Sequence, residues 1–164
     1  MKTKLLNILR LILVFKPFET ILTYFTSGSI FGSFLSKIPP NHYQYKTPVS
    51  RKVKRNGINY KLDISDIIDW YIYYGFRELS KELLLANIKE NDTVIDVGAN
   101  VGEISLRAAN IVGNKKGIVY SFEPDHINFN RFLNNMEINA VKNIIPINKG
   151  CLLYTSDAAD DWFC

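Results

Sequence analysis

Residues 93–102 read Thr-Val-Ile-Asp-Val-Gly-Ala-Asn-Val-Gly, a short apolar run that ends in a glycine-rich turn. The run predicts a buried strand over 93–97, and the apolar spacing that follows predicts a helix through residues 104–111. A glycine turn between a strand and a helix is typical of nucleotide-binding sheets. Glycine lets a ligand approach the backbone there, and the N-terminus of the helix offers free N–H groups.

The same alternation continues along the chain. Residues 118–122 (Ile-Val-Tyr-Ser-Phe) predict a second strand, residues 126–139 a helix capped by Asp125, and residues 144–147 a third strand. Strand–helix–strand–helix–strand at this pitch predicts an α/β fold with a parallel sheet and right-handed crossovers.

An acidic residue directly follows the second predicted strand. Glu123 lies 21 residues after Gly102, where its carboxylate could accept both hydroxyls of a ribose. The dinucleotide fingerprint G-x-G-x-x-G is absent, because residues 98–103 read Gly-Ala-Asn-Val-Gly-Glu. The order of turn, helix, strand and acid therefore indicates an adenosine-containing cofactor, with an NAD-dependent oxidoreductase kept as an alternative.

The D-x-G-x-N-x-G form of the turn resembles the first motif of S-adenosylmethionine-dependent methyltransferases. More closely, VIDVGANVG at 94–102 followed by VYSFEPDHINF at 119–129 resembles the FkbM-type methyltransferase family. The resemblance covers residues 58–149. It implies the first half of a Rossmann-like class I methyltransferase sheet, S-adenosyl-L-methionine as cofactor, and methyl transfer to a sugar hydroxyl of a glycan or natural product.

The resemblance also implies roles for five residues. Gly98, Asn100 and Gly102 would face the methionine portion of the cofactor, Asp96 would brace the loop, and Glu123 would hold the ribose. The Asn100 amide is predicted to hydrogen-bond the cofactor carboxylate. Asp96 keeps a purely structural interpretation as an alternative. No catalytic base and no metal ligand is assigned.

Three other polar residues are given no chemistry. His126 is interpreted as a first-turn surface residue and His42 as part of a linker, while the charge of Glu103 suits the start of a helix.

The N-terminal segment, residues 1–48, is predicted to be a basic amphipathic region and linker. Residues 1–62 hold eleven Lys/Arg and a single acid, Glu19. Apolar side chains at 2–15 predict an amphipathic helix that Pro17 stops or kinks. Arg10 and Lys16 interrupt it too early for a membrane span. It either docks on the main domain, which we favour, or lies on an anionic membrane surface. We expect a cytoplasmic protein, with peripheral membrane contact as the alternative.

Residues 49–90 are predicted to form a hairpin and helices that lead into the core. Asn56-Gly57 between residues 51–55 and 58–62 is a strong hairpin signal. The four basic residues of the first strand fit phosphate contacts, but they more often protect an edge strand. Asp66 with Ser65 is predicted to cap a helix that carries an aromatic cluster at 69–74 and ends at Gly75. A second helix over 77–88 is predicted to bury Leu79, Leu83, Leu84 and Ala86.

The partner that the FkbM-type resemblance implies is a small-molecule or glycan hydroxyl acceptor, and no nucleic-acid partner is expected. An RNA-directed methyltransferase that grips phosphates with the basic N-terminal segment is the alternative.

The tail, residues 151–164, reads differently from the rest. Residues 151–161 (Cys-Leu-Leu-Tyr-Thr-Ser-Asp-Ala-Ala-Asp-Asp) allow a back-translation that resembles a transposon end joined to a sequencing adapter. We therefore expect residues 91–150 to be a partial S-adenosylmethionine-binding domain that is truncated near Gly150. We expect residues 1–150, expressed alone, to be poorly soluble and inactive. Without the three tail aspartates the net charge rises from +4 to +7. The first strand of the sheet would then lie at an exposed edge.

Overall fold

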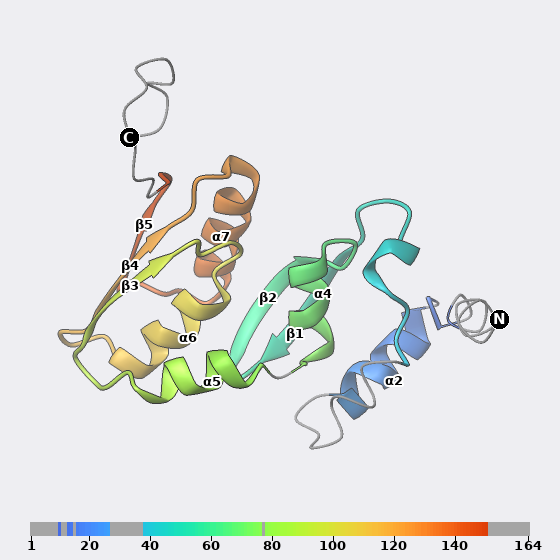
Figure 1. The fold of residues 1–164 in the computed structure, drawn as a ribbon, viewed down its shortest axis with the longest axis horizontal. Helices are drawn as coiled ribbons and strands as arrows, with labels where there is room; N and C mark the ends of the chain where they lie inside the picture. The colour runs from blue at the N-terminus through green and yellow to red at the C-terminus, as the bar shows by residue number, and fades with distance from the viewer. Residues whose placement is uncertain (1–9, 11–12, 15, 27–37, 77, 151–164) are drawn as a thin grey trace, which may run out of the picture. The chain divides into compact units, whose positions relative to one another are not determined.

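The computed structural model describes residues 10, 13–14, 16–26, 38–76 and 78–150. The chain divides into two compact units, which are described separately (Figure 1). Unit 1 comprises residues 1–55 and 60–79, and unit 2 comprises residues 56–59 and 80–164. The tail at 151–164 and nearly all of the helix predicted over 2–15 lie outside the described residues. In the part of the chain that is described, no helix is long and apolar enough to cross a membrane.

Unit 1 is built from a helix, a hairpin and a second helix, with a short 3-10 turn between the first helix and the hairpin. Its elements are α2 (Lys16–Thr26), η1 (His42–Gln44), β1 (Ser50–Arg55), β2 (Ile58–Asp63) and α4 (Ile67–Tyr74). Helix α4 packs against both α2 and β1. The core of this unit includes two β2 side chains that are at most 2% exposed, Tyr60 and Leu62.

Helix α2 is not predicted by the sequence pattern. Pro17, the residue expected to stop or kink a helix, lies in the first turn of one. Proline is tolerated there because the first N–H groups of a helix have no intrahelical partner, and its fixed φ suits the helix. Glu19 also lies in this first turn, where a negative charge complements the helix dipole.

The predicted hairpin and the predicted α4 are both confirmed. Asn56 and Gly57 take φ values of 50° and 81°, as a type I′ turn requires. The Asp66 side chain caps α4, and Gly75 ends it with a φ of 71°. The aromatic cluster of α4 is a packing feature, since Trp70, Tyr73 and Tyr74 are buried.

Unit 2 contains a parallel sheet in the order β3-β4-β5, as the sequence predicted. Its main elements are α5 (Leu79–Ala86), β3 (Thr93–Val97), α6 (Glu103–Val112), β4 (Ile118–Phe122), α7 (His126–Ile138) and β5 (Ile144–Ile147). The register pairs Val97 with Phe122 and Phe122 with Ile147, so the strands end at one common edge. This parallel arrangement of three strands and their helices matches the predicted Rossmann-like fold.

The two faces of this sheet differ in burial. Helix α6 packs on all three strands, and Val119 on its side is fully buried. Ile95 and Val97 of β3, and Ile145 of β5, point the other way and are 67%, 58% and 42% exposed. Strand β3 lies at the edge of the described sheet, in agreement with the prediction for this strand.

The buried stripe predicted for α5 is wrong. Leu79, Leu83 and Leu84 are 74%, 58% and 53% exposed, Ala86 is exposed as well, and Leu85 is the buried residue. Lys81 and Glu82 precede Leu85 by four and three residues, so they share its face.

Ion pairs to α6 explain this orientation of α5. Lys81 Nζ lies 2.8 Å from a carboxylate oxygen of Glu103, and Arg107 donates to both carboxylate oxygens of Glu82, at 2.9 and 3.0 Å. Two charged contacts thus turn the polar side of α5 toward α6, and Leu79, Leu83 and Leu84 face outward.

Candidate cofactor site

The candidate site lies where β3 runs through residues 98–102 into α6. Its backbone turns sharply, since Gly98, Asn100 and Gly102 have φ values of 88°, 51° and 88°. The N–H groups of Gly98 and Ala99 both donate to the carbonyl of Phe122, at 2.8 and 2.9 Å. The loop is therefore tied to the C-terminal end of the neighbouring strand β4.

The two glycines of the loop serve different purposes. A Cβ on Gly102 would overlap the ring of Phe132, so this glycine allows α7 to pack against the loop. A Cβ on Gly98 would meet no atom within 4 Å. Gly98 therefore has open space beside it. A ligand can approach the backbone only where such space exists.

Asp96, the residue predicted to brace the loop, contacts the helix that follows the loop. Its side chain accepts a hydrogen bond from the Ser105 hydroxyl in the first turn of α6. Burial raises the pKa of Asp96, hydrogen bonds from Ser105 oppose this rise, and the nearby charge of Glu123 adds to it. The sequence reasoning missed Ser105, and its place three residues after Gly102 is the signal that could have found it.

Glu123 is the central acceptor of the site and is only 6% exposed. One carboxylate oxygen accepts the N–H of Asn100 at 2.8 Å, and the other accepts the N–H of Asp125 at 2.9 Å. Its own N–H donates to the carbonyl of Ile147 on β5 at 3.0 Å. Each carboxylate oxygen can accept a further hydrogen bond, so this side chain can still bind a diol.

The Asn100 side chain has a buried acceptor atom without a partner. Its Oδ1 atom is buried and, within the described part of the chain, accepts no hydrogen bond. An unpaired buried acceptor costs about 1–3 kcal/mol. An N–H group of a ligand would remove this cost, so Oδ1 suits an ammonium group better than a carboxylate.

The structure thus brings Asp96, Gly98, Asn100, Gly102 and Glu123 together at one edge of the sheet. The sequence reasoning missed Asn135 of α7, which is fully buried and donates to the carbonyl of Val101 at 3.0 Å. An asparagine inside a predicted apolar stripe carries little signal in a single sequence.

The residues that received no chemistry lie outside this cluster. His126 and His42 are not buried, and Glu103 pairs with Lys81. Among the described residues, no group of three His, Cys, Asp or Glu side chains could hold a metal ion.

Comparison with protein families assigns most of the chain to a methyltransferase domain. Residues 51–161 match the family model described as the TRM5/TYW2 methyltransferase domain. The match includes the hairpin, the whole sheet and the candidate site, and it runs into the segment predicted to be adapter-derived. That prediction about the tail stays a prediction. No curated protein matches the chain.

Several solved structures with similarity to the chain are described as methyltransferases or methylases. TYW2 of P. horikoshii, in complex with MeSAdo, is 26% identical over 63% of this chain and 37% of its own, with a TM-score of 0.49. M. jannaschii TYW2, in complex with AdoMet, is 22% identical over 63% of this chain and 44% of its own, with a TM-score of 0.48. An rRNA methylase from Streptococcus thermophilus is 16% identical over 44% of this chain and 41% of its own, with a TM-score of 0.38.

These structures are distant, and this chain spans less than half the length of each. The family match, which covers two thirds of the chain, carries the assignment instead. It supports the predicted methyltransferase superfamily and does not support the FkbM-type resemblance or the sugar acceptor. The TRM5/TYW2 match also conflicts in part with the expectation of no nucleic-acid partner.

Proposed function

The chain belongs to the TRM5/TYW2 methyltransferase domain family, and from this premise we propose that it binds S-adenosylmethionine and methylates an RNA. The observation that carries the proposal is that the family match spans both the 98–102 loop and Glu123. The loop and the carboxylate are the two parts that an adenosine-containing cofactor needs.

The residues of the candidate site fit this cofactor. The diol of the ribose would be held by Glu123, whose oxygens each keep an acceptor position. The methionine portion would lie over Gly98, where an added Cβ would meet no atom within 4 Å. Its ammonium would satisfy the buried Oδ1 of Asn100.

When bound, S-adenosylmethionine supplies a methyl group on a positively charged sulfur. The side chains of this protein hold the loop in place: Asp96 fixes the first turn of α6, and Glu123 fixes the Asn100 N–H. A rigid loop orients the donor toward the acceptor, and such orientation is the main contribution a protein makes to this kind of transfer.

An RNA acceptor is favoured over a sugar hydroxyl for two reasons. The family model is TRM5/TYW2, whose members methylate tRNA, rather than FkbM-type. The basic composition of the chain, with 20 Lys/Arg against 16 Asp/Glu, also suits a polyanionic partner.

Two measurements test the proposal. Calorimetry with S-adenosylmethionine should give saturable binding that weakens at least tenfold in Glu123→Ala, because the ribose acceptor is lost. Glu137→Ala, at an exposed position on α7, should bind as the unmodified protein does.

Transfer of a tritiated methyl group is then compared for a tRNA transcript, an rRNA fragment and a polysaccharide. Any methyl transfer by the chain should label the RNA alone. Label in the polysaccharide, or no binding of the cofactor at all, would contradict the proposal.

A further inference from the structure

The basic residues of β1 alternate between two faces of the hairpin. Arg51 and Arg55 are half-buried, whereas Lys52 and Lys54 are exposed. Successive side chains of a strand point to opposite faces, so the pairs are separated by the geometry of the strand itself. The four charges that the sequence presents as one run therefore lie in two different environments.

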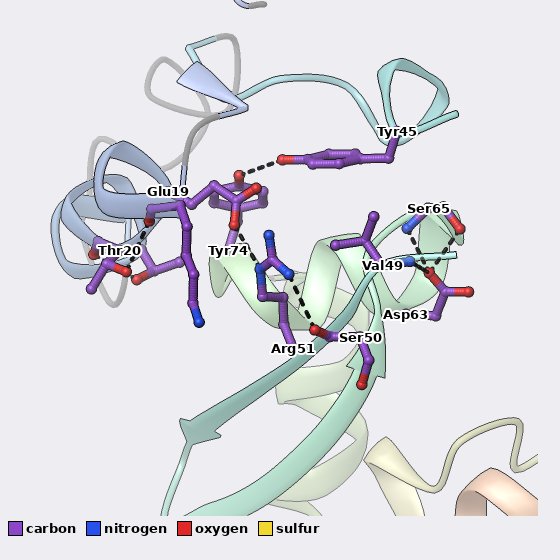
Figure 2. A network of polar contacts seen from close by, with 11 residues as sticks. Glu19, Thr20, Tyr45, Val49, Ser50, Arg51, Asp63, Ser65 and Tyr74 are labelled. Atoms are coloured by element: carbon purple, nitrogen blue, oxygen red, sulfur yellow. Dashed lines mark hydrogen bonds and ion pairs between the residues drawn. The ribbon is translucent and has the colours of Figure 1, made fainter. Parts of the chain in front are cut away.

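The two arginines are part of the interior of unit 1. Arg51 donates from Nε to the buried carboxylate of Glu19 on α2, at 2.8 Å (Figure 2). Arg55 donates to the carbonyl of Tyr73 at the end of α4, and to that of Thr23 in the last turn of α2 at 3.2 Å. A guanidinium placed on helix C-termini is favourable because it meets unpaired carbonyls and the negative end of the helix dipole.

The opposite face of the hairpin is basic and hydrophilic. We define the lysine face as Lys52 and Lys54 of β1 with Lys61 of β2, all three exposed. The other exposed residues of the two strands are Ser50 and Asn59, so the outward side of the strands presents no exposed acid. Within the described residues, neither Lys52 nor Lys54 forms an ion pair. These two lysines therefore place uncompensated positive charge on the face.

We propose that the lysine face binds the phosphate backbone of the RNA substrate. This inference rests on the RNA acceptor proposed above and assigns a surface to it. Lys52 and Lys54 stand two residues apart, about 7 Å along the strand, so they can reach successive groups of a phosphate chain. Lysine ammonium groups bind phosphates as point charges, without reading sequence.

A membrane surface fits the same face less well. Peripheral membrane binding combines basic residues with apolar side chains that insert between lipids. The exposed side chains of β1 and β2 are the three lysines, Ser50 and Asn59. None of them is an apolar side chain that could insert between lipids. The charge pattern alone, with no aromatic platform, favours contact with a nucleic-acid backbone.

The test compares two double variants of the full 164-residue chain. Lys52→Ala/Lys54→Ala removes two charges from the lysine face. Lys115→Ala/Lys116→Ala removes two charges from exposed positions in the turn before β4 and is the matched control. Affinity for a labelled RNA stem-loop is measured between about 50 and 200 mM salt, a range in which phosphate contacts change affinity steeply.

The slope of log K against log [salt] is negative, and in the lysine-face variant we expect its magnitude to decrease by about 2. In the control we expect the slope to stay unchanged. Equal slopes in both variants would overturn the inference. So would a lysine-face variant that loses binding to vesicles of anionic lipid but binds RNA normally.

Cofactor calorimetry on the same samples separates this inference from the proposed function. If S-adenosylmethionine fails to bind while the RNA slope still falls only in the lysine-face variant, the lysine face stands and the enzymatic proposal fails. If the cofactor binds and the unmodified chain has no affinity for RNA, the lysine-face inference and the RNA acceptor both fail.

Discussion

The carboxylate of Glu123 accepts the backbone N–H of Asn100 at 2.8 Å, so the end of β4 holds the turn that follows β3. The other oxygen of the same carboxylate accepts the N–H of Asp125. A single buried acid thus fixes two loops at the edge of the sheet where the candidate site lies. We expect it to contribute to stability even without cofactor.

Glu123→Gln should lower the free energy of unfolding by about 1–3 kcal/mol. Glutamine has one acceptor oxygen, so it can satisfy one of the two N–H donors and leaves the other buried without a partner. Urea unfolding followed by circular dichroism measures the change, with Glu137→Gln as the control at an exposed position. Equal stability of the two variants would show that the N–H groups find other acceptors.

The two loop glycines should respond differently to the same substitution. Gly102→Ala places a Cβ into the Phe132 ring at a φ of 88°, so we expect a loss of roughly 3 kcal/mol in stability. Gly98→Ala meets no neighbouring atom and should cost only the strain of its positive φ, roughly 1–2 kcal/mol. The larger effect of Gly98→Ala should be on affinity for S-adenosylmethionine, because the methyl group of the alanine occupies the open space beside the loop.

Unfolding and calorimetry on both glycine variants check this contrast. The prediction fails if Gly98→Ala binds the cofactor normally, or if Gly102→Ala is as stable as Gly98→Ala.

Features set by a few neighbouring residues could be predicted from the sequence. The Asn56-Gly57 turn, the Asp66 cap and the glycine loop all follow from local backbone preferences, and all are present. The order of β3, β4 and β5 also followed, because the alternation of strands and helices restricts the topology.

The face that a short helix buries could not be predicted in the same way. Eight residues of α5 contain four leucines, so periodicity does not distinguish one side from another. The choice depends on Glu103 and Arg107 of α6, which are distant in sequence from the residues they pair with. The partner of Arg51 is likewise 32 positions away, at Glu19.

Substitutions in α5 test the corrected orientation of this helix. Leu85→Ala should lower the free energy of unfolding by about 2–5 kcal/mol, since this side chain is 4% exposed. Leu84→Ala, next to it and 53% exposed, should change stability by at most about 0.5 kcal/mol. A larger loss of stability in Leu84→Ala than in Leu85→Ala would contradict this orientation. It would favour the buried stripe that was predicted from the sequence.

The raised pKa of Asp96 predicts a particular pH dependence. A carboxyl whose pKa is higher in the folded state binds its proton more tightly there, so folding is favoured at low pH. As pH rises through and above the ordinary aspartate value of 3.8, this contribution is lost. The stability of the unmodified protein relative to Asp96→Asn should therefore decrease with rising pH in that range. Urea unfolding of both proteins at a series of pH values measures the difference, and a relative stability that increases with pH would contradict it.

The ion pair between Glu19 and Arg51 should be strongly coupled, because the Glu19 carboxylate is fully buried (Figure 2). Arg51→Met leaves that carboxylate without its donor, and we expect a loss of roughly 3 kcal/mol. Glu19→Leu removes the buried charge itself and should cost less. The double variant Glu19→Leu/Arg51→Met should be more stable than Arg51→Met alone, since a buried pair replaced by apolar side chains leaves no charge unpaired. A double-mutant cycle in urea measures the coupling, and strictly additive effects would mean that water already solvates Glu19 in the folded protein.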